Sequence, residues 1–138
     1  MTPDGNWIIA VDFDGTLITG NTWPDVCGEP NRKLISFLIG QKKKGNKIIL
    51  WTNRTDVPEK ESYPLRDAVE FCRAAGLEFD AVNENLPEII QAYGSDSRKV
   101  SADTYIDDKA FNPDYVNLVL YEEFGIPLST KSFVVNEK

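Results

Sequence analysis

Two aspartates separated by one residue carry the clearest chemistry in this chain. Asp12 and Asp14 stand in the stretch DFDGT, directly after the apolar run Trp7–Val11. Carboxylates beside a buried run need a partner, and a bound cation would keep both of them charged. An isolated DxD stretch more often caps a segment or lies in a solvated turn, but the apolar run in front of this one favours a functional site.

A second apolar run also ends in polar residues. The stretch KIILWT, residues 47–52, is followed by Asn53 and Arg54. The hydroxyl of Thr52, an amide and a guanidinium in this position suit the oxygens of a phosphate, the guanidinium through its fork geometry. The alternative is a helix cap followed by a surface arginine.

A third run, Thr104–Ile106, ends in the adjacent pair Asp107 and Asp108. Neighbouring like charges repel, so this pair beside another carboxylate would be destabilising unless a cation lay among them. Lys99 and Lys109 stand on either side of the run. Either of them fits a role in the site, and the alternative makes both surface ions.

The absence of histidine limits the chemistry. Among 138 residues there is none, which excludes histidine-assisted nucleophiles and imidazole bases. Two cysteines without histidine cannot complete a usual zinc site. Proton transfer therefore falls to Asp or Glu, and a metal held by oxygen ligands is expected to be Mg²⁺.

The composition is that of a globular protein with one domain over residues 1–138. It is 41% hydrophobic and 27% charged, with a net charge of −7 that argues against a broad nucleic-acid surface. We find no long apolar run and no signal peptide, so we expect a cytoplasmic protein with no membrane segment. Cys27 and Cys72 are expected to be reduced thiols rather than a disulfide.

The spacing of apolar residues predicts an α/β fold with a three-layer, doubly wound, Rossmann-like sheet that is mainly parallel. Expected strands are residues 7–11, 47–52, 78–82 and 104–106. The first expected helix begins at Pro30 and Asn31 and ends before Gly45. Further helices are expected over residues 64–75, 87–93 and 113–124, and the tail is expected to form a final edge strand or to be ordered only in an assembly.

Loops complete the expected site. In the irregular stretch after Leu17, the residues Asn21, Trp23 and Pro24 would overhang the carboxylates and touch a substrate, unless Trp23 only packs the loop down. Asn83 either lines the same rim or forms an Asx-turn.

With DFDGT after the first strand, LWTNR at the end of the second and RKVSADTYIDD at the end of a later one, the sequence resembles the haloacid dehalogenase superfamily of aspartate-nucleophile phosphohydrolases. It is most similar to the small members without a cap domain, because the spacers hold only the elements already assigned. By this resemblance Asp12 is the nucleophile, and Asp14 protonates the leaving oxygen and then activates water. Thr52 binds a phosphoryl oxygen, and Lys99 offsets charge in the transition state, with Lys109 as its rival.

The resemblance also implies a metal site and substrate contacts. Asp12, the backbone carbonyl of Asp14 and Asp107 would hold Mg²⁺, with Asp108 as a direct ligand or as a partner through water. The residues expected to contact substrate are Phe13, Gly15, Thr16, Asn53 and Arg54.

The expected function is therefore hydrolysis of a small phosphomonoester through an aspartyl-phosphate, with Mg²⁺ as cofactor. A noncatalytic protein that binds a phosphorylated ligand on the same fold is the alternative. A phosphotransferase or a nucleic-acid end phosphatase would use the same residues, although the negative charge argues against the latter. Without a cap domain the site is open, so a neighbouring copy in a homo-oligomer could serve as its lid.

Overall fold

The described part of the protein ends soon after the third acidic stretch. The computed structural model describes residues 1–110. The chain divides into two units, Met1–Asp108 and Lys109–Lys138, so a single domain over residues 1–138 stays a prediction. The expected helix over residues 113–124 and the final edge strand lie outside the described residues.

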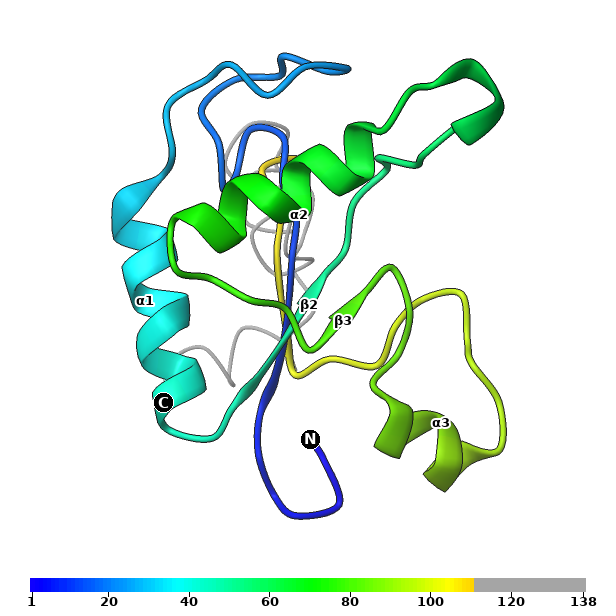
Figure 1. Ribbon diagram of the computed structural model, residues 1–138. Coiled ribbons are helices and arrows are strands. Elements are labelled where there is room, and N and C mark those ends of the chain that lie inside the picture. Colours follow the sequence, from blue (N-terminus) through cyan, green and yellow to red (C-terminus); the bar gives the residue numbers. More distant parts are fainter. Residues whose placement is uncertain (111–138) are drawn as a thin grey trace, which may run out of the picture. The chain divides into compact units, whose positions relative to one another are not determined.

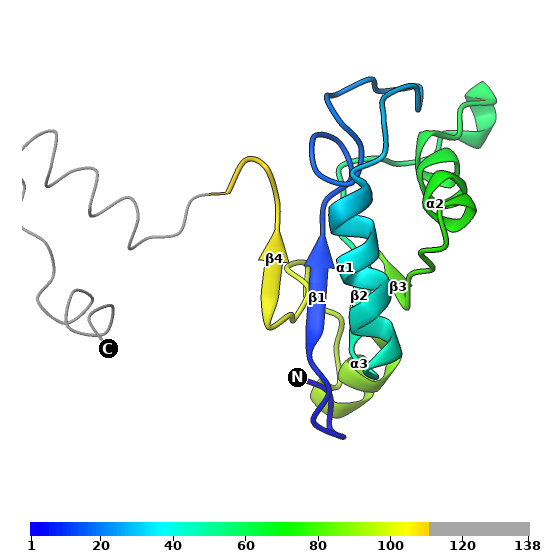
Figure 2. The ribbon, with the colours of Figure 1, turned by 90° about the vertical axis from the view of Figure 1, so that its left-hand side faces the viewer.

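A parallel sheet forms the centre of residues 1–108. Its strand order is β3-β2-β1-β4, and every neighbouring pair is parallel (Figures 1 and 2). The strands are β1 (Ile8–Val11), β2 (Lys47–Leu50), β3 (Ala81–Val82) and β4 (Thr104–Ile106). The α/β class and the parallel sheet are confirmed, and β4 has the predicted bounds.

Strand β3 is shorter than predicted. The expected strand over residues 78–82 is reduced to Ala81–Val82. Asp80, just before β3, bonds to β2 with both its side chain and its backbone. The Ile48 N–H donates to Asp80 Oδ2 at 2.8 Å, where a strand would offer a backbone carbonyl, and the Asp80 N–H donates to the Ile48 carbonyl at 2.8 Å. A carboxylate can thus take over a ladder position and delay the start of a strand.

Within residues 1–110, three α-helices accompany the strands: α1 (Arg32–Lys43), α2 (Pro64–Ala74) and α3 (Pro87–Tyr93), with a short 3-10 turn η1 (Pro58–Lys60) before α2. Asn31 caps α1 by accepting the Leu34 N–H at 3.2 Å, as Asn does at helix N-termini. Gly45 follows the end of α1 at φ +91°, a conformation that glycine adopts without strain.

One large apolar residue of α1 faces solvent. Phe37 is 51% exposed, whereas Ile35 and Leu38 are buried. Residues two apart on a helix differ by about 200°, so Ile35 and Phe37 cannot both face the sheet.

The sheet is covered on both faces, which gives three layers. Ile9 and Val11 belong to a core cluster with buried residues of α1 and α2. Ile8 and Ala10 alternate with them and pack in a second cluster with Leu86 and residues of α3. Figure 1 shows α1 and α3 on opposite sides of the strands, and Figure 2 shows β1 and β4 with their carboxyl ends at the same edge. Because side chains alternate along a strand, β1 must be apolar throughout.

Two further expectations concern membrane-spanning helices and the cysteines. None of the helices in residues 1–110 has the length and apolar content needed to cross a bilayer. Cys27 is exposed, Cys72 is buried in α2, and both thiols are free, as predicted.

Candidate active site

Three carboxylates meet at the carboxyl edge of the sheet. Strands β1 and β4 are parallel neighbours in which Val11 pairs with Ile106, and the Asp12 N–H continues the ladder by donating to the Ile106 carbonyl at 2.9 Å. Asp12 and Asp107 therefore leave the sheet side by side. One oxygen each from Asp12, Asp107 and Asp108 lies within 4.8 Å of the others. A set of oxygens at this spacing matches the ligands that Mg²⁺ uses.

The surroundings of Asp12 disfavour its charged form. The pKa of Asp12 is raised to about 6, with burial as the largest cause, against a lowering by a hydrogen bond from the Phe13 N–H. The charges of Asp107 and Asp108, together with a hydrogen bond between the carboxyl groups of Asp12 and Asp108, contribute to the same rise. A divalent cation among these oxygens would remove both penalties, because it compensates desolvation and like-charge repulsion together.

Gly15 and Thr16 hold Asp108 in place. Gly15 lies at φ +74°, and a Cβ at this position would collide with the carboxylate of Asp108. Thr16 is only 7% exposed, and its hydroxyl oxygen accepts the Asp108 N–H at 3.2 Å. Gly15 and Thr16 thus connect the loop after β1 to Asp108, which follows β4. Thr16 was predicted to contact substrate, and the structure gives it a supporting position instead, because its side chain is buried against the backbone of Asp108.

Asp14 lies apart from the acidic cluster and forms an ion pair. Its Oδ2 accepts from Arg54 Nε at 2.9 Å, and its Oδ1 accepts from Arg54 Nη2 at 2.8 Å. This is the bidentate geometry in which a guanidinium binds a carboxylate most strongly. The predicted metal contact of Asp14 uses its backbone carbonyl, which this ion pair leaves untouched.

Arg54 is not available to a substrate, contrary to the prediction. It is 1% exposed. Besides the two bonds to Asp14, Nη1 donates to the carbonyls of Pro24 and Pro64, each at 3.1 Å, and Nη2 donates to the Asp25 carbonyl at 2.8 Å. All five N–H donors of the guanidinium are thereby used, and a phosphate would have to displace one of these partners.

Phe13 was also predicted to contact substrate, and its side chain is in the core instead. It is fully buried and packs edge-to-face against Phe71, with ring centroids 5.8 Å apart. The Cζ atom of Arg54 lies 4.9 Å from the centre of the Phe13 ring. Burial of a ring beside the acidic loop anchors that loop to the core.

The end of β2 adjoins the same edge and is held by Asn83. The Thr52 N–H donates to Asn83 Oδ1 at 2.8 Å, and Asn83 Nδ2 donates to the Arg54 carbonyl at 3.3 Å. The hydroxyl oxygen of Thr52 accepts the Arg54 N–H at 3.1 Å, which leaves its own proton free to donate. Asn83, at φ +54°, thus supports the rim rather than forming a simple Asx-turn. Asn53 is exposed and remains a predicted substrate contact.

Lys99, the predicted catalytic lysine, is not brought to the acidic cluster. Its ammonium lies 5.0 Å from the centre of the Tyr105 ring, and within residues 1–108 no hydrogen bond or ion pair joins it to a carboxylate. Lys109 begins the second unit. The assignment of a phosphate-facing lysine to Lys99 or Lys109 therefore stays a prediction.

The loop between β1 and α1 presents an aromatic side chain. Trp23 is 59% exposed, so it does not pack the loop down. The backbone N–H of Trp23 donates to Asn21 Oδ1 at 3.1 Å. The carbonyls of Pro24 and Asp25, which follow it in the loop, accept hydrogen bonds from Arg54. Sequence reasoning missed these carbonyls, since backbone acceptors have no residue signature.

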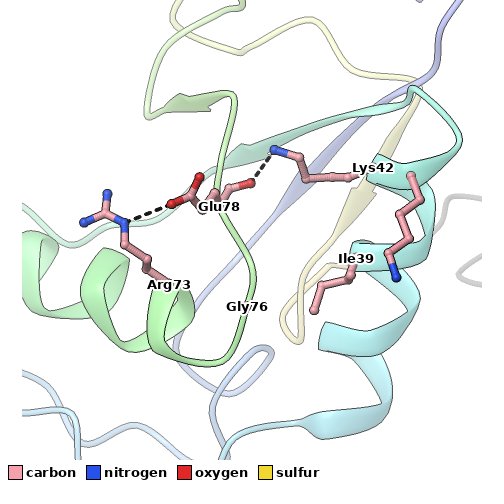
Figure 3. A pocket seen from close by; sticks show the side chains of 6 residues that line it. Ile39, Lys42, Arg73, Gly76 and Glu78 are labelled. Atoms are coloured by element: carbon pink, nitrogen blue, oxygen red, sulfur yellow. Dashed lines mark hydrogen bonds and ion pairs between the residues drawn. The ribbon is translucent and has the colours of Figure 1, made fainter.

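A pocket of about 440 Å³ lies elsewhere. Its walls come from the last turns of α1 and α2 and the segment after them, where Arg73 pairs with Glu78 at 3.3 Å and Lys42 Nζ donates to the Glu78 carbonyl at 2.7 Å (Figure 3). None of the predicted site residues lines it. Lys42, near the end of α1, thus joins this helix to the segment after α2.

Comparisons with known proteins place the chain beside one solved structure. No protein-family model matches it, and no curated protein does. A structure described as that of a conserved protein coded by a locus from Bacteroides thetaiotaomicron is 34% identical, with a TM-score of 0.62, over 89% of this chain and 94% of that one. Identity at this level over nearly the whole of both chains shows common descent, and the chain belongs to the same family as this conserved Bacteroides protein.

Proposed function

We propose that the protein is a Mg²⁺-dependent phosphohydrolase of the haloacid dehalogenase type that cleaves a phosphomonoester through an aspartyl-phosphate on Asp12. The observation that carries the proposal is the acidic cluster, in which oxygens of Asp12, Asp107 and Asp108 lie within 4.8 Å of one another. Like charges this close repel one another, and a bridging cation would relieve the repulsion. The resemblance of DFDGT, LWTNR and IDD to that superfamily supplies the chemistry.

The donor set suits Mg²⁺. Asp12, Asp107 and the backbone carbonyl of Asp14 would hold the ion, and Asp108 would bind it directly or through water. When bound, Mg²⁺ supplies charge neutralisation that lets an anionic carboxylate approach an anionic phosphate.

The chain's own residues account for the remaining steps. An oxygen of Asp12 forms a bond to phosphorus while the bond to the leaving oxygen breaks, and Asp14 gives that oxygen a proton. Water then attacks the phosphoaspartate, gives its proton to Asp14, and the Asp12 carboxylate is released with inorganic phosphate. The free hydroxyl proton of Thr52 is suited to a phosphoryl oxygen.

A noncatalytic protein that binds a phosphorylated ligand is the second candidate, and the position of Lys99 favours it. The Lys99 ammonium lies over the ring of Tyr105. In that function Asp12 would bind metal without being phosphorylated.

Replacing the nucleophile separates the two candidates. The Asp12→Asn variant and wild type are assayed with Mg²⁺ on a panel of phosphomonoesters. We expect turnover in wild type that is lost with EDTA and falls at least about 10³-fold in Asp12→Asn, since the attacking oxygen is removed. Asp67→Asn is the matched control, because Asp67 is a partly exposed aspartate of α2 that pairs with Arg66 at 3.7 Å. Turnover that survives in Asp12→Asn would refute the covalent route.

A ligand that mimics the phosphoryl group tests binding independently of turnover. Fluoroberyllate or vanadate should raise the melting temperature of wild type when Mg²⁺ is present, because a ligand that binds only the folded state stabilises it. The same additions should leave the melting temperature of Asp12→Asn nearly unchanged. Phosphate-analogue binding without any turnover would support the noncatalytic candidate.

A further inference from the structure

We propose that Arg54 is a positioning residue that holds Asp14 and the loop over residues 18–31 as one unit beside the acidic cluster. The inference rests on the proposed function, because it assigns a role in that reaction. The starting observation is that Arg54 has the largest fully buried side chain among residues 1–110.

The contacts of Arg54 join segments that are distant in sequence. Its donors bind Asp14, 40 residues away, the carbonyls of Pro24 and Asp25 in the loop, and the carbonyl of Pro64 at the start of α2. One face of the guanidinium also covers the ring of Phe13.

Stability alone is a weak reason for this arrangement. A buried ion pair often adds nothing to stability compared with apolar residues of similar volume, because both charges lose their hydration. The geometry instead gives directional control, since two parallel bonds of 2.9 and 2.8 Å fix the plane of the Asp14 carboxylate.

The same group fixes the loop relative to Asp14. Arg54 Nη2 donates both to Asp14 Oδ1 and to the Asp25 carbonyl, each at 2.8 Å. A displacement of the loop that carries Trp23 would thus be transmitted to the carboxylate through one rigid, planar group. The loop lies next to Asp14, since Ile18 pairs with Asp14. Residues 1–110 contain no inserted domain that would cover the site.

A substitution in two backgrounds tests whether Arg54 acts through Asp14. Arg54→Lys keeps the charge and removes the fork. In wild type we expect kcat to fall by about 10- to 100-fold, as for a misplaced reacting group, with KM and the Kd of Mg²⁺ changed less than about threefold. In the Asp14→Asn background the same substitution should change kcat by less than about threefold, because the group that it positions is already lost.

Arg73→Lys is the matched control. Arg73 also pairs with a carboxylate, that of Glu78 at 3.3 Å, but it is 60% exposed at the far end of α2, and its replacement should leave kcat unchanged. Equal losses from Arg54→Lys in both backgrounds would overturn the inference and leave the proposed function standing. Absence of Mg²⁺-dependent turnover in wild type would overturn both.

A measurement on wild type covers the case in which Arg54→Lys does not fold. The Arg54 Nε–H resonance is followed by ¹⁵N NMR while Mg²⁺ and then orthovanadate are added. We expect vanadate to shift this resonance by more than its linewidth, because Nε donates directly to Asp14 at 2.9 Å, while the Arg73 Nε–H resonance stays in place. An unmoved Arg54 resonance, with vanadate binding shown by an increased melting temperature, would overturn the inference.

Discussion

Aspartates of the same local pattern have different surroundings in this protein. Asp12 is half-buried beside two other carboxylates, and its pKa is raised to about 6, first by burial. Asp14, two residues later, faces a guanidinium. Asp108 is exposed and packs against Gly15. The surroundings of each aspartate are therefore set by its neighbours in space, and the proposed metal site holds like charges close together when no cation is bound.

The Asp108→Asn variant tests this cost at the level of one residue. Without metal at pH 7.5 we expect it to raise the free energy of unfolding by about 1 kcal/mol, because one of the charges that oppose ionisation of Asp12 is removed. Its affinity for Mg²⁺ should fall. Chemical denaturation and calorimetric titration measure the two effects. A metal-free variant less stable than wild type would contradict the explanation, and Asp67→Asn should change neither quantity.

At the level of the elements, two aspartates begin strands in the same way. Asp103 and Asp80 each donate a backbone N–H and accept one with the side chain: Asp103 Oδ2 accepts from Ile8 at 2.7 Å, and Asp80 Oδ2 accepts from Ile48 at 2.8 Å. Each carboxylate thus satisfies the first buried amide of a central strand. The parallel ladder then continues from these points toward the acidic edge.

The Asp103→Ala and Asp80→Ala variants should each lower the free energy of unfolding by about 1–3 kcal/mol, because a backbone N–H at the sheet is left without its acceptor. Asp103→Asn and Asp80→Asn retain an oxygen at the same position and should lose less than half as much. Urea denaturation of all four variants provides the measurement. Equal losses for the Ala and Asn variants would show that charge, rather than the acceptor, matters.

At the level of the whole molecule, the proposed binding of Mg²⁺ would be linked to pH through Asp12. Its pKa is about 6 in the folded protein, against 3.8 as the ordinary value. Between these values the folded state binds more protons than the unfolded state, so the metal-free protein loses stability as the pH rises from about 4 to about 6. Protons compete with a metal for the same oxygen over this range.

Saturating Mg²⁺ should therefore raise the melting temperature more at pH 7.5 than at pH 5. At the higher pH Asp12 is already ionised, and binding releases no proton from it. Thermal unfolding with and without Mg²⁺ at both pH values gives the comparison. In Asp12→Asn the difference between the two pH values should largely disappear, and a shift in wild type that is independent of pH would argue against Asp12 as a ligand.

The sequence by itself determined the parallel α/β fold, the helix α3 and the strand β4 to the residue, and the meeting of Asp12 with Asp107 and Asp108. These features follow from local periodicity and from polar residues placed after apolar runs, which parallel strands bring to one edge. Only the tertiary structure decided the positions of Arg54, Phe13 and Thr16. Arg54 reads as a phosphate ligand beside Thr52, yet its partners are a carboxylate 40 residues away and carbonyls of a distant loop. A guanidinium binds a phosphate or a carboxylate equally well, so the fold that places Asp14 beside it determines which of them it binds.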